Sequence, residues 1–356
     1  MANKILRMKK ATRTDLITYA SVTIIFLVLL LMNSQGMLSR SLKGQLVPIC
    51  CYMSMAVSLN LVVGILGDLS LGHAGFMSVG AFSGAIAAMS LTNMPDVFRV
   101  IIAMLIGAIF AAIVGMIVGA PVLKLHGDYL AIVTLAFGEI IKDIINCLVV
   151  GVDKTGLKIR FDFAGKLTID DLKLAEDGIA IIKGPQGTAG VDTIASFPIG
   201  YVLVMITLLV VLNLKRSRAG RAIMALRDNT IAAESIGINV TKYKLMAFVT
   251  SAALAGAAGG LFGLTQSSLQ ATKFNFNQSI LILVFVVMGG LGNIWGSLIS
   301  AAVLTILPEA LREFADYRML VYAIVLILIM IFTNNPVMVD LFSKLRPRFK
   351  SKGGTS

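Results

Sequence analysis

The sequence places an acid, a hydroxyl and an imidazole close together between two apolar runs. Asp68, Ser70 and His73 lie in the stretch 64–76, which also contains four glycines. Such side chains can bind a polar solute or pass a proton, and the glycines indicate irregular backbone around them. Two interpretations are open at this point. The residues line a substrate path, or they form a simple turn between two helices.

A second group of ionisable residues lies in the apolar run 129–150. Glu139 is near its centre, and Lys142 and Asp143 follow at i+3 and i+4, where a helix would place them on the same face. A charge in the middle of an apolar span is costly unless it is paired or solvated. Internal ion pairing is one interpretation of Glu139. The alternatives are that it lines an aqueous path or contacts a partner subunit.

The stretch 218–239, RAGRAIMALRDNTIAAESIGIN, is the most specific polar segment. Asp228 is the predicted N-cap of a short helix over 229–236, and Gly237 lies where a left-handed residue commonly ends a helix. A compact, capped helix in a connection between apolar runs favours the docking of a partner. A charged turn without a partner is the alternative.

The elements that position these residues follow from composition. Of the 356 residues 57% are hydrophobic and only 14% are charged, and the mean hydropathy is +0.88. These values leave too few polar side chains to cover a water-facing surface, so soluble and disordered classes are excluded. Crossing the hydrocarbon core takes roughly 20 apolar residues. Apolar runs occur at 16–33, 46–66, 70–91, 97–120, 129–150, 197–214, 245–265, 276–290, 293–308 and 319–334.

The last long apolar stretch is split at Gly289-Gly290-Leu291-Gly292-Asn293, because each glycine costs a helix about 1 kcal/mol. Several runs also carry small residues at four-residue spacing, which predicts close helix packing. We therefore predict an all-α integral membrane protein with about ten transmembrane helices, some of them short or broken. The whole chain, 1–356, would form a single transmembrane domain.

The distribution of charge predicts the topology. Seventeen of the 31 Lys and Arg residues fall in 1–15, 215–244 and 336–356, and retention of basic segments in the cytoplasm places all three inside. The connection 151–196 has no positive excess and is predicted to be an extracytoplasmic loop. The net charge of +12 therefore indicates topology, and nucleic acid is not an expected partner.

Several kinds of chemistry have no motif in this chain. There is no phosphate-binding loop, no H-E-x-x-H sequence and no catalytic Ser/His/Asp motif, so we expect no enzyme activity and no cofactor or nucleotide bound by this chain. The cysteines at 50, 51 and 147 are odd in number and lie in apolar runs, which predicts neither a disulfide nor a metal site.

Several stretches together resemble the M-type (LivM-like) permease subunits of bacterial ATP-binding-cassette importers for branched-chain amino acids. They extend over about residues 60–310. The matching stretches are Leu69–Phe76, Gly127–Leu135, Phe137–Ile140, Gly220–Asn239, Tyr243–Leu245, Ala247–Phe248, Ser251–Ala252, Ala255–Gly256 and Val286–Gly292.

The resemblance implies a permease in the bacterial inner membrane that works with other subunits. These would be a second, LivH-like permease, two cytoplasmic ATP-binding subunits that use ATP, and an extracytoplasmic substrate-binding protein. In such permeases an Ala-Ala-x-x-x-Gly pattern marks the element that couples to the ATPase. Applied to this sequence, the expected coupling residues are Arg221, Arg227, Asp228, Ala232, Ala233, Glu234, Gly237 and Ile238.

The substrate remains open between several solutes. Branched-chain or related aliphatic amino acids are favoured, while related permeases carry urea, short amides or other small polar solutes. An ion-coupled secondary transporter that uses Glu139, Asp68 and His73 is a second hypothesis, although no self-similarity between the two halves supports it. A membrane scaffold or receptor is disfavoured because no soluble effector domain is present.

Overall fold

The computed structural model describes residues 10–311 except 37–38, 93, 126, 154–155 and 162–178, together with 320, 323–324 and 327. The chain divides into two compact units, Met1–Ile306 and Leu307–Ser356. The predicted basic segment 336–356 lies outside the described residues, as does most of 1–15.

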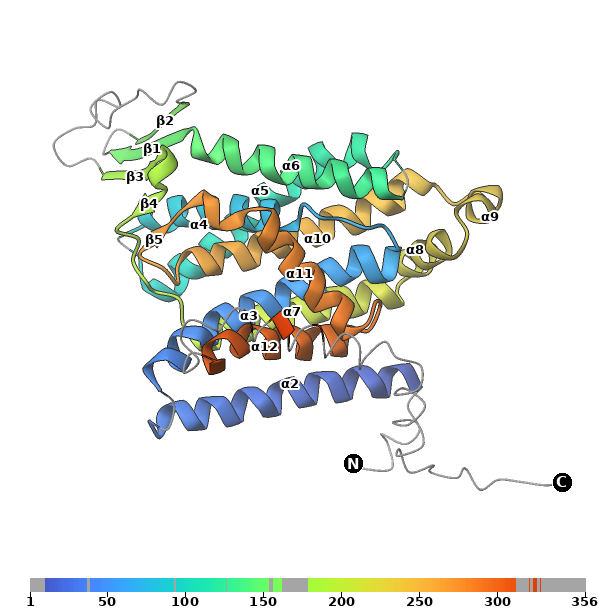
Figure 1. The fold of residues 1–356 in the computed structure, drawn as a ribbon, viewed down its shortest axis with the longest axis horizontal. Coiled ribbons are helices and arrows are strands. Elements are labelled where there is room, and N and C mark those ends of the chain that lie inside the picture. The colour runs from blue at the N-terminus through green and yellow to red at the C-terminus, as the bar shows by residue number, and fades with distance from the viewer. Residues whose placement is uncertain are drawn as a thin grey trace. The chain divides into compact units, whose positions relative to one another are not determined.

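Helices form in the first nine of the ten predicted apolar runs (Figure 1). The tenth run, 319–334, lies mostly outside the described residues. The elements in these runs are α2 (Lys10–Ser34), α3 (Arg40–Asn60) with its π-helical extension η1 (Leu61–Leu66), α4 (His73–Ser90), α5 (Asp96–Val122), α6 (Asp128–Asn146), α7 (Phe197–Arg216), α10 (Val240–Gly263), α11 (Phe276–Gly289) and α12 (Ile294–Ala310).

Four helical segments of the described chain are long and apolar enough to cross a membrane. They are Arg40–Leu66, Asp96–Val122, Phe197–Arg216 and Val240–Gly263. Shorter apolar helices occur at Thr18–Ser34, Phe276–Gly289 and Ile294–Ala310. The helical architecture thus suits a membrane protein, while the number of about ten crossings stays a prediction.

The predicted break in the last long apolar stretch is confirmed. Helix α11 ends at Gly289 and α12 begins at Ile294. Between them Gly290 and Gly292 have φ angles of 89° and 78°, a left-handed conformation that a helix cannot contain and that glycine adopts without strain.

The expectation of an all-α fold is confirmed only in part, because the described chain is mostly helical but also forms strands. The structure contains a five-stranded antiparallel sheet in the order β2-β1-β3-β4-β5. The strands are β1 (Leu148–Asp153), β2 (Gly156–Phe161), β3 (Ile179–Lys183), β4 (Thr188–Ala189) and β5 (Ser268–Leu269). Consequently α6 ends at Asn146, short of the predicted 150. The physical reason is local, since Val149, Val150 and Val152 are β-branched and favour a strand.

Small residues bring α4, α5 and α10 into close backbone contact, as their spacing predicts. A Cβ atom on Gly80 would lie 2.0 Å from the Gly256 carbonyl oxygen, and one on Gly256 would lie 2.3 Å from that of Gly107. Only glycine leaves space for backbones at this separation. The core of the first unit is therefore built around these three helices.

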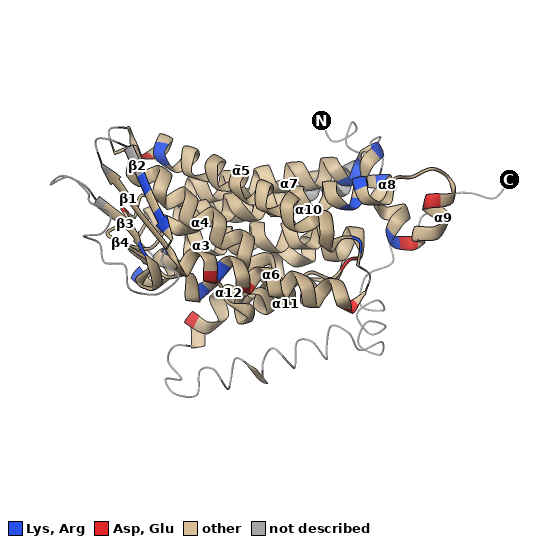
Figure 2. Cartoon of the chain, turned by 90° about the horizontal axis from the view of Figure 1, so that it is seen from above, with Lys and Arg blue, Asp and Glu red and all other residues tan. Residues whose placement is uncertain are grey.

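The described part of the predicted 151–196 connection and the 215–244 connection lie at opposite ends of the helix bundle (Figure 1). The sheet covers one end, and helices α8 (Arg218–Asp228) and α9 (Thr230–Ser235) project from the other (Figure 1). Figure 2 shows charged residues gathered at these two ends, with few along the helices between them. The predicted topology places these two connections on opposite sides of the membrane, and their separation in the structure is compatible with it (Figure 1).

Candidate functional site: the α8–α9 segment and the interrupted helices

The α8–α9 segment is held in shape by side-chain caps. Ser217 Oγ accepts a hydrogen bond from Gly220 N at 3.0 Å and caps α8. Asn229 Oδ1 accepts from Ala232 N at 3.0 Å and caps α9, so the predicted cap, Asp228, is wrong by one residue. Asp228 instead belongs to α8, where its carboxylate lies 3.3 Å from Arg227. A short helix of this kind depends on its cap, because its own turns supply few hydrogen bonds.

The predicted role of Gly237 in ending the helix is confirmed. Its φ angle is 85°, and its N–H donates to the Glu234 carbonyl oxygen at 2.9 Å. The next residue, Ile238, donates its N–H to the Ala233 carbonyl oxygen at 3.1 Å. The two bonds satisfy carbonyls that the helix end leaves open.

Replacing Asn229 by Ala should loosen α9 and leave the rest of the bundle intact. Losing an N-cap costs about 1 kcal/mol, so amide exchange over 230–235 should quicken about fivefold. Hydrogen-exchange mass spectrometry of the detergent-solubilised protein measures this. Asp228→Ala serves as the matched control, and equal acceleration in the two variants would contradict the assignment of the cap.

The predicted coupling residues differ in what they present to solvent. Arg221, Asp228, Ala232, Glu234 and Gly237 are exposed, Ile238 is partly exposed, and Ala233 is buried. Two large apolar side chains that the sequence analysis did not select, Ile231 and Ile236, are 79% and 78% exposed. The sequence did offer a signal for them, because both are large apolar residues in a polar segment, between the predicted cap and Gly237.

Arg227 is also exposed, at 45% of its side chain, yet its guanidinium contacts the bundle. Its Nη1 donates to the carbonyl oxygen of Gly64 in η1 at 3.1 Å. Its aliphatic stem lies against Gly67, where a Cβ atom would meet Arg227 Cγ at 2.5 Å. Arg227 therefore connects α8 to the interrupted helix, a contact that residue type alone did not indicate.

Asp68 forms a buried ion pair. Its Oδ1 and Oδ2 atoms lie 3.0 and 2.8 Å from Lys244 Nζ in α10, and the two side chains are only 16% and 5% exposed. Lys244 was counted among the basic residues of the cytoplasmic connection, yet it is buried at the start of a helix. The 67–72 stretch is thus not an ordinary exposed turn, because it is tied into the protein at Asp68.

Ser70 and His73 are also buried. His73 Nε2 lies 2.8 Å from Ser58 Oγ in α3, and the Ala74 N–H at the start of α4 donates to Ser279 Oγ in α11 at 3.2 Å. Ser70 Oγ has no hydrogen-bond partner among the described residues. The interruption between η1 and α4 therefore brings polar groups of three helices together inside the bundle.

Glu139 is paired internally, as one of the interpretations expects. It forms an ion pair with Lys142, which also lies 3.6 Å from Asp143. Glu139 Oε1 additionally accepts the Phe276 N–H at 2.8 Å, at the positive N-terminal end of α11. The structure does not join Glu139 to Asp68, Ser70 or His73 by any contact among the described residues. It forms a separate polar site.

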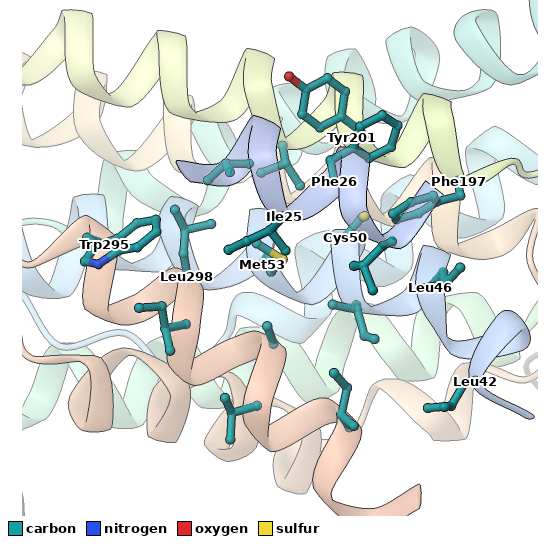
Figure 3. A pocket seen from close by; sticks show the side chains of 18 residues that line it. Ile25, Phe26, Leu42, Leu46, Cys50, Met53, Phe197, Tyr201, Trp295 and Leu298 are labelled. Atoms are coloured by element: carbon teal, nitrogen blue, oxygen red, sulfur yellow. The ribbon is translucent and has the colours of Figure 1, made fainter. Parts of the chain in front are cut away.

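An apolar pocket of about 470 Å³ lies elsewhere, among α2, α3, α7 and α12 (Figure 3). Leu46 and Cys50 of α3, Phe197 of α7 and Trp295 of α12 are among its lining residues, and none of the predicted site residues is. Among the described residues no group of three His, Cys, Asp or Glu could hold a metal ion. The polar candidates and this pocket are therefore distinct.

Comparison with known proteins identifies the family. Residues 42–332 match the family model for the permease component of branched-chain amino acid transport systems. The chain is 33% identical over 310 residues to the high-affinity branched-chain amino acid transport permease LivM of Salmonella typhimurium, covering 85% of this chain and 70% of the relative. It is also 33% identical over 312 residues to LivM of Escherichia coli, covering 86% and 71%.

More distant similarity reaches sugar permeases. The ribose import permease RbsC of Haemophilus influenzae is 28% identical over 299 residues, covering 79% of this chain and 80% of the relative. No solved structure matches the chain. A match over most of the length to a family model and to LivM relatives is decisive, and the chain belongs to the family of permease components of branched-chain amino acid transport systems.

Proposed function

We propose that this permease works as one half of the membrane part of an ATP-driven importer in the bacterial inner membrane. A second, LivH-like permease would complete the path, two ATP-binding subunits would supply energy, and an extracytoplasmic binding protein would deliver the substrate. A relative of this chain is named as a LivH permease, which supports a paired arrangement.

The observation that carries the proposal is a pair of exposed apolar side chains, one in α9 and one directly after it, which together make the docking face. Ile231 and Ile236 leave most of their surface uncovered, and they lie at one of the two charged ends of the bundle (Figure 2). Large apolar side chains in water are stabilised by covering them with a partner. We assign this face, with Ala232, Glu234 and Gly237, to contact with the ATP-binding subunit. Its side of the membrane is then the cytoplasm, which agrees with the basic residues around it.

For the substrate we propose branched-chain or related aliphatic amino acids, with Asp68, Ser70, His73 and Glu139 near the path. The polar groups between η1 and α4 could contact the charged ends of an amino acid as the helices separate. Urea or a short amide is the alternative substrate, supported by the same polar groups. Both Asp68 and Glu139 have lysine partners, so neither is a free proton carrier, which weighs against an ion-coupled transporter.

Reconstitution of the purified complex tests this function. Liposomes should take up radiolabelled leucine only when the second permease, both ATP-binding subunits and the binding protein are present with ATP. Leucine uptake by this chain alone, driven by a proton or sodium gradient, would contradict the proposal. Uptake of urea in place of leucine would keep the mechanism and select the alternative substrate.

Replacing Ile231 and Ile236 by Asp should release the ATP-binding subunits. Charges on this face remove apolar contact at the centre of the interface, so affinity should fall about tenfold or more. Co-purification of the tagged permease with its ATPase measures the loss. As a control, Ile159→Asp introduces one such charge on β2, at the opposite end, where Ile159 is 52% exposed. This control should retain the ATPase, and full retention by the Ile231/Ile236 variant would refute the assigned contact.

A further inference from the structure

The ends of two interrupted helices lie against each other in the bundle. Gly292, in the break between α11 and α12, donates its N–H to Asn60 Oδ1 at 2.8 Å, just before η1 begins. Asn60 Nδ2 in turn donates to Ser297 Oγ in α12 at 2.9 Å. A Cβ atom on Gly64 would lie 2.2 Å from the Gly292 nitrogen. The two breaks therefore form one tightly fitted joint.

Two cations complete this joint through backbone carbonyl oxygens. Arg227 Nη1 donates to Gly64 O at 3.1 Å, and Lys215 Nζ donates to Gly292 O at 3.3 Å. Gly64 lies in the last turn of the α3–η1 helix, where carbonyl groups are open and the helix dipole favours a positive charge. We name Asn60, Gly64, Lys215, Arg227 and Gly292 the clasp.

The clasp is directly connected to the proposed docking face. Arg227 is the penultimate residue of α8, and Asn229, two residues further on, caps α9. Leu226 and Ile223 bury the inner side of α8 against the bundle, so α8 is anchored as far as Leu226 and only Arg227 and Asp228 lie beyond that anchor. A displacement of α9 would therefore move Arg227, which is only two residues from the α9 cap, and with it the hydrogen bond to Gly64 O.

We propose that Arg227 is the positioning residue that transmits movement of α9 to the two helix breaks. While the clasp is closed, Arg227 and Asn60 hold the end of η1 against the 290–293 break. When the ATP-binding subunits draw α9 away, the Arg227 guanidinium leaves Gly64 O and the two broken ends separate. This inference rests on the proposed function and adds the route by which docking reaches the path.

Arg227→Met tests the route because it keeps the apolar stem and removes the donors. In the reconstituted complex this variant should retain its ATP-binding subunits and hydrolyse ATP. The leucine transported per ATP should fall about tenfold, as expected for losing a charge-assisted hydrogen bond. Arg227→Lys should recover part of the ratio, since an ammonium can reach a single carbonyl. Arg218→Ala removes an exposed charge from the first turn of α8 and should match the wild type.

The possible outcomes separate this inference from the proposed function. A wild-type transport ratio in Arg227→Met would overturn the inference, and so would loss of the ATPase from this variant, because Arg227 would then act in docking. If Arg227→Met is not recovered as a folded complex, Lys215→Met probes the clasp at Gly292 and should show the same fall, with an unchanged ratio again overturning it. A wild-type complex without ATP-driven uptake would instead defeat the proposed function.

Discussion

Lys244→Met should lower the free energy of unfolding by about 3 kcal/mol or more, because it leaves the Asp68 carboxylate buried without a partner. The pair is well shielded, with side-chain exposures of 5% for Lys244 and 16% for Asp68. Removing one member therefore leaves a charge that water only partly solvates. Unfolding of the purified permease by titration with a denaturing detergent, followed by circular dichroism, measures the change.

A double-mutant cycle shows whether the effect belongs to the pair. Asp68→Asn combined with Lys244→Met removes both charges and should recover a large part of the loss, since no unpaired ion remains. Additive losses in the double variant would indicate that the two residues act independently. That result would contradict the ion pair as the tie between the 67–72 stretch and α10.

The sequence was sufficient to predict features set by neighbouring residues. Apolar runs located the helices because burial in lipid demands a continuous apolar segment. The glycines at 290 and 292 located the break, and Gly237 located the end of α9, because a positive φ is a local property of glycine. The i+3 spacing of Glu139 and Lys142 likewise allowed their ion pair to be anticipated.

Features that depend on contacts between distant segments could not be predicted from the sequence. Strand β5 joins the sheet about 80 residues after β4, and Asp68 finds Lys244 176 residues away. Arg227 carries the same charge as Arg221, yet only the fold shows that it bonds to Gly64 while Arg221 bonds to the Arg216 carbonyl beside it. Asp228 and Asn229 are both good capping residues, and the choice between them depends on where α8 ends.

These differences bear on how the permease could work. Three of the four predicted path residues are not free to bind a solute, since Asp68, His73 and Glu139 already have partners. Access to them requires the helices around the two breaks to separate. The joint between Gly64 and Gly292 is therefore a better place to look for transport-related movement than the α4–α5–α10 core, whose backbones are in direct contact.

Gly256→Ala should be among the most damaging single-atom additions to this protein. The new methyl group would lie 2.3 Å from the Ala111 Cβ and 2.3 Å from the Gly107 carbonyl oxygen, and both neighbours belong to the fixed helix α5. Neither can rotate away, so α5 and α10 must move apart and lose packing along their whole contact. We expect a loss of about 1–3 kcal/mol, measured by the same detergent titration.

Gly44→Ala makes the identical change in a different environment and isolates the steric cause. Gly44 lies in helix α3, and no atom within 4 Å would meet its added Cβ. Alanine is the better helix former, so this variant should be unchanged or gain up to about 1 kcal/mol. Because helix propensity favours both substitutions equally, opposite signs at the two positions can only come from the contact with α5. Equal behaviour of the two variants would show that α5 and α10 do not touch at Gly256, and the packing of the core would have to be revised.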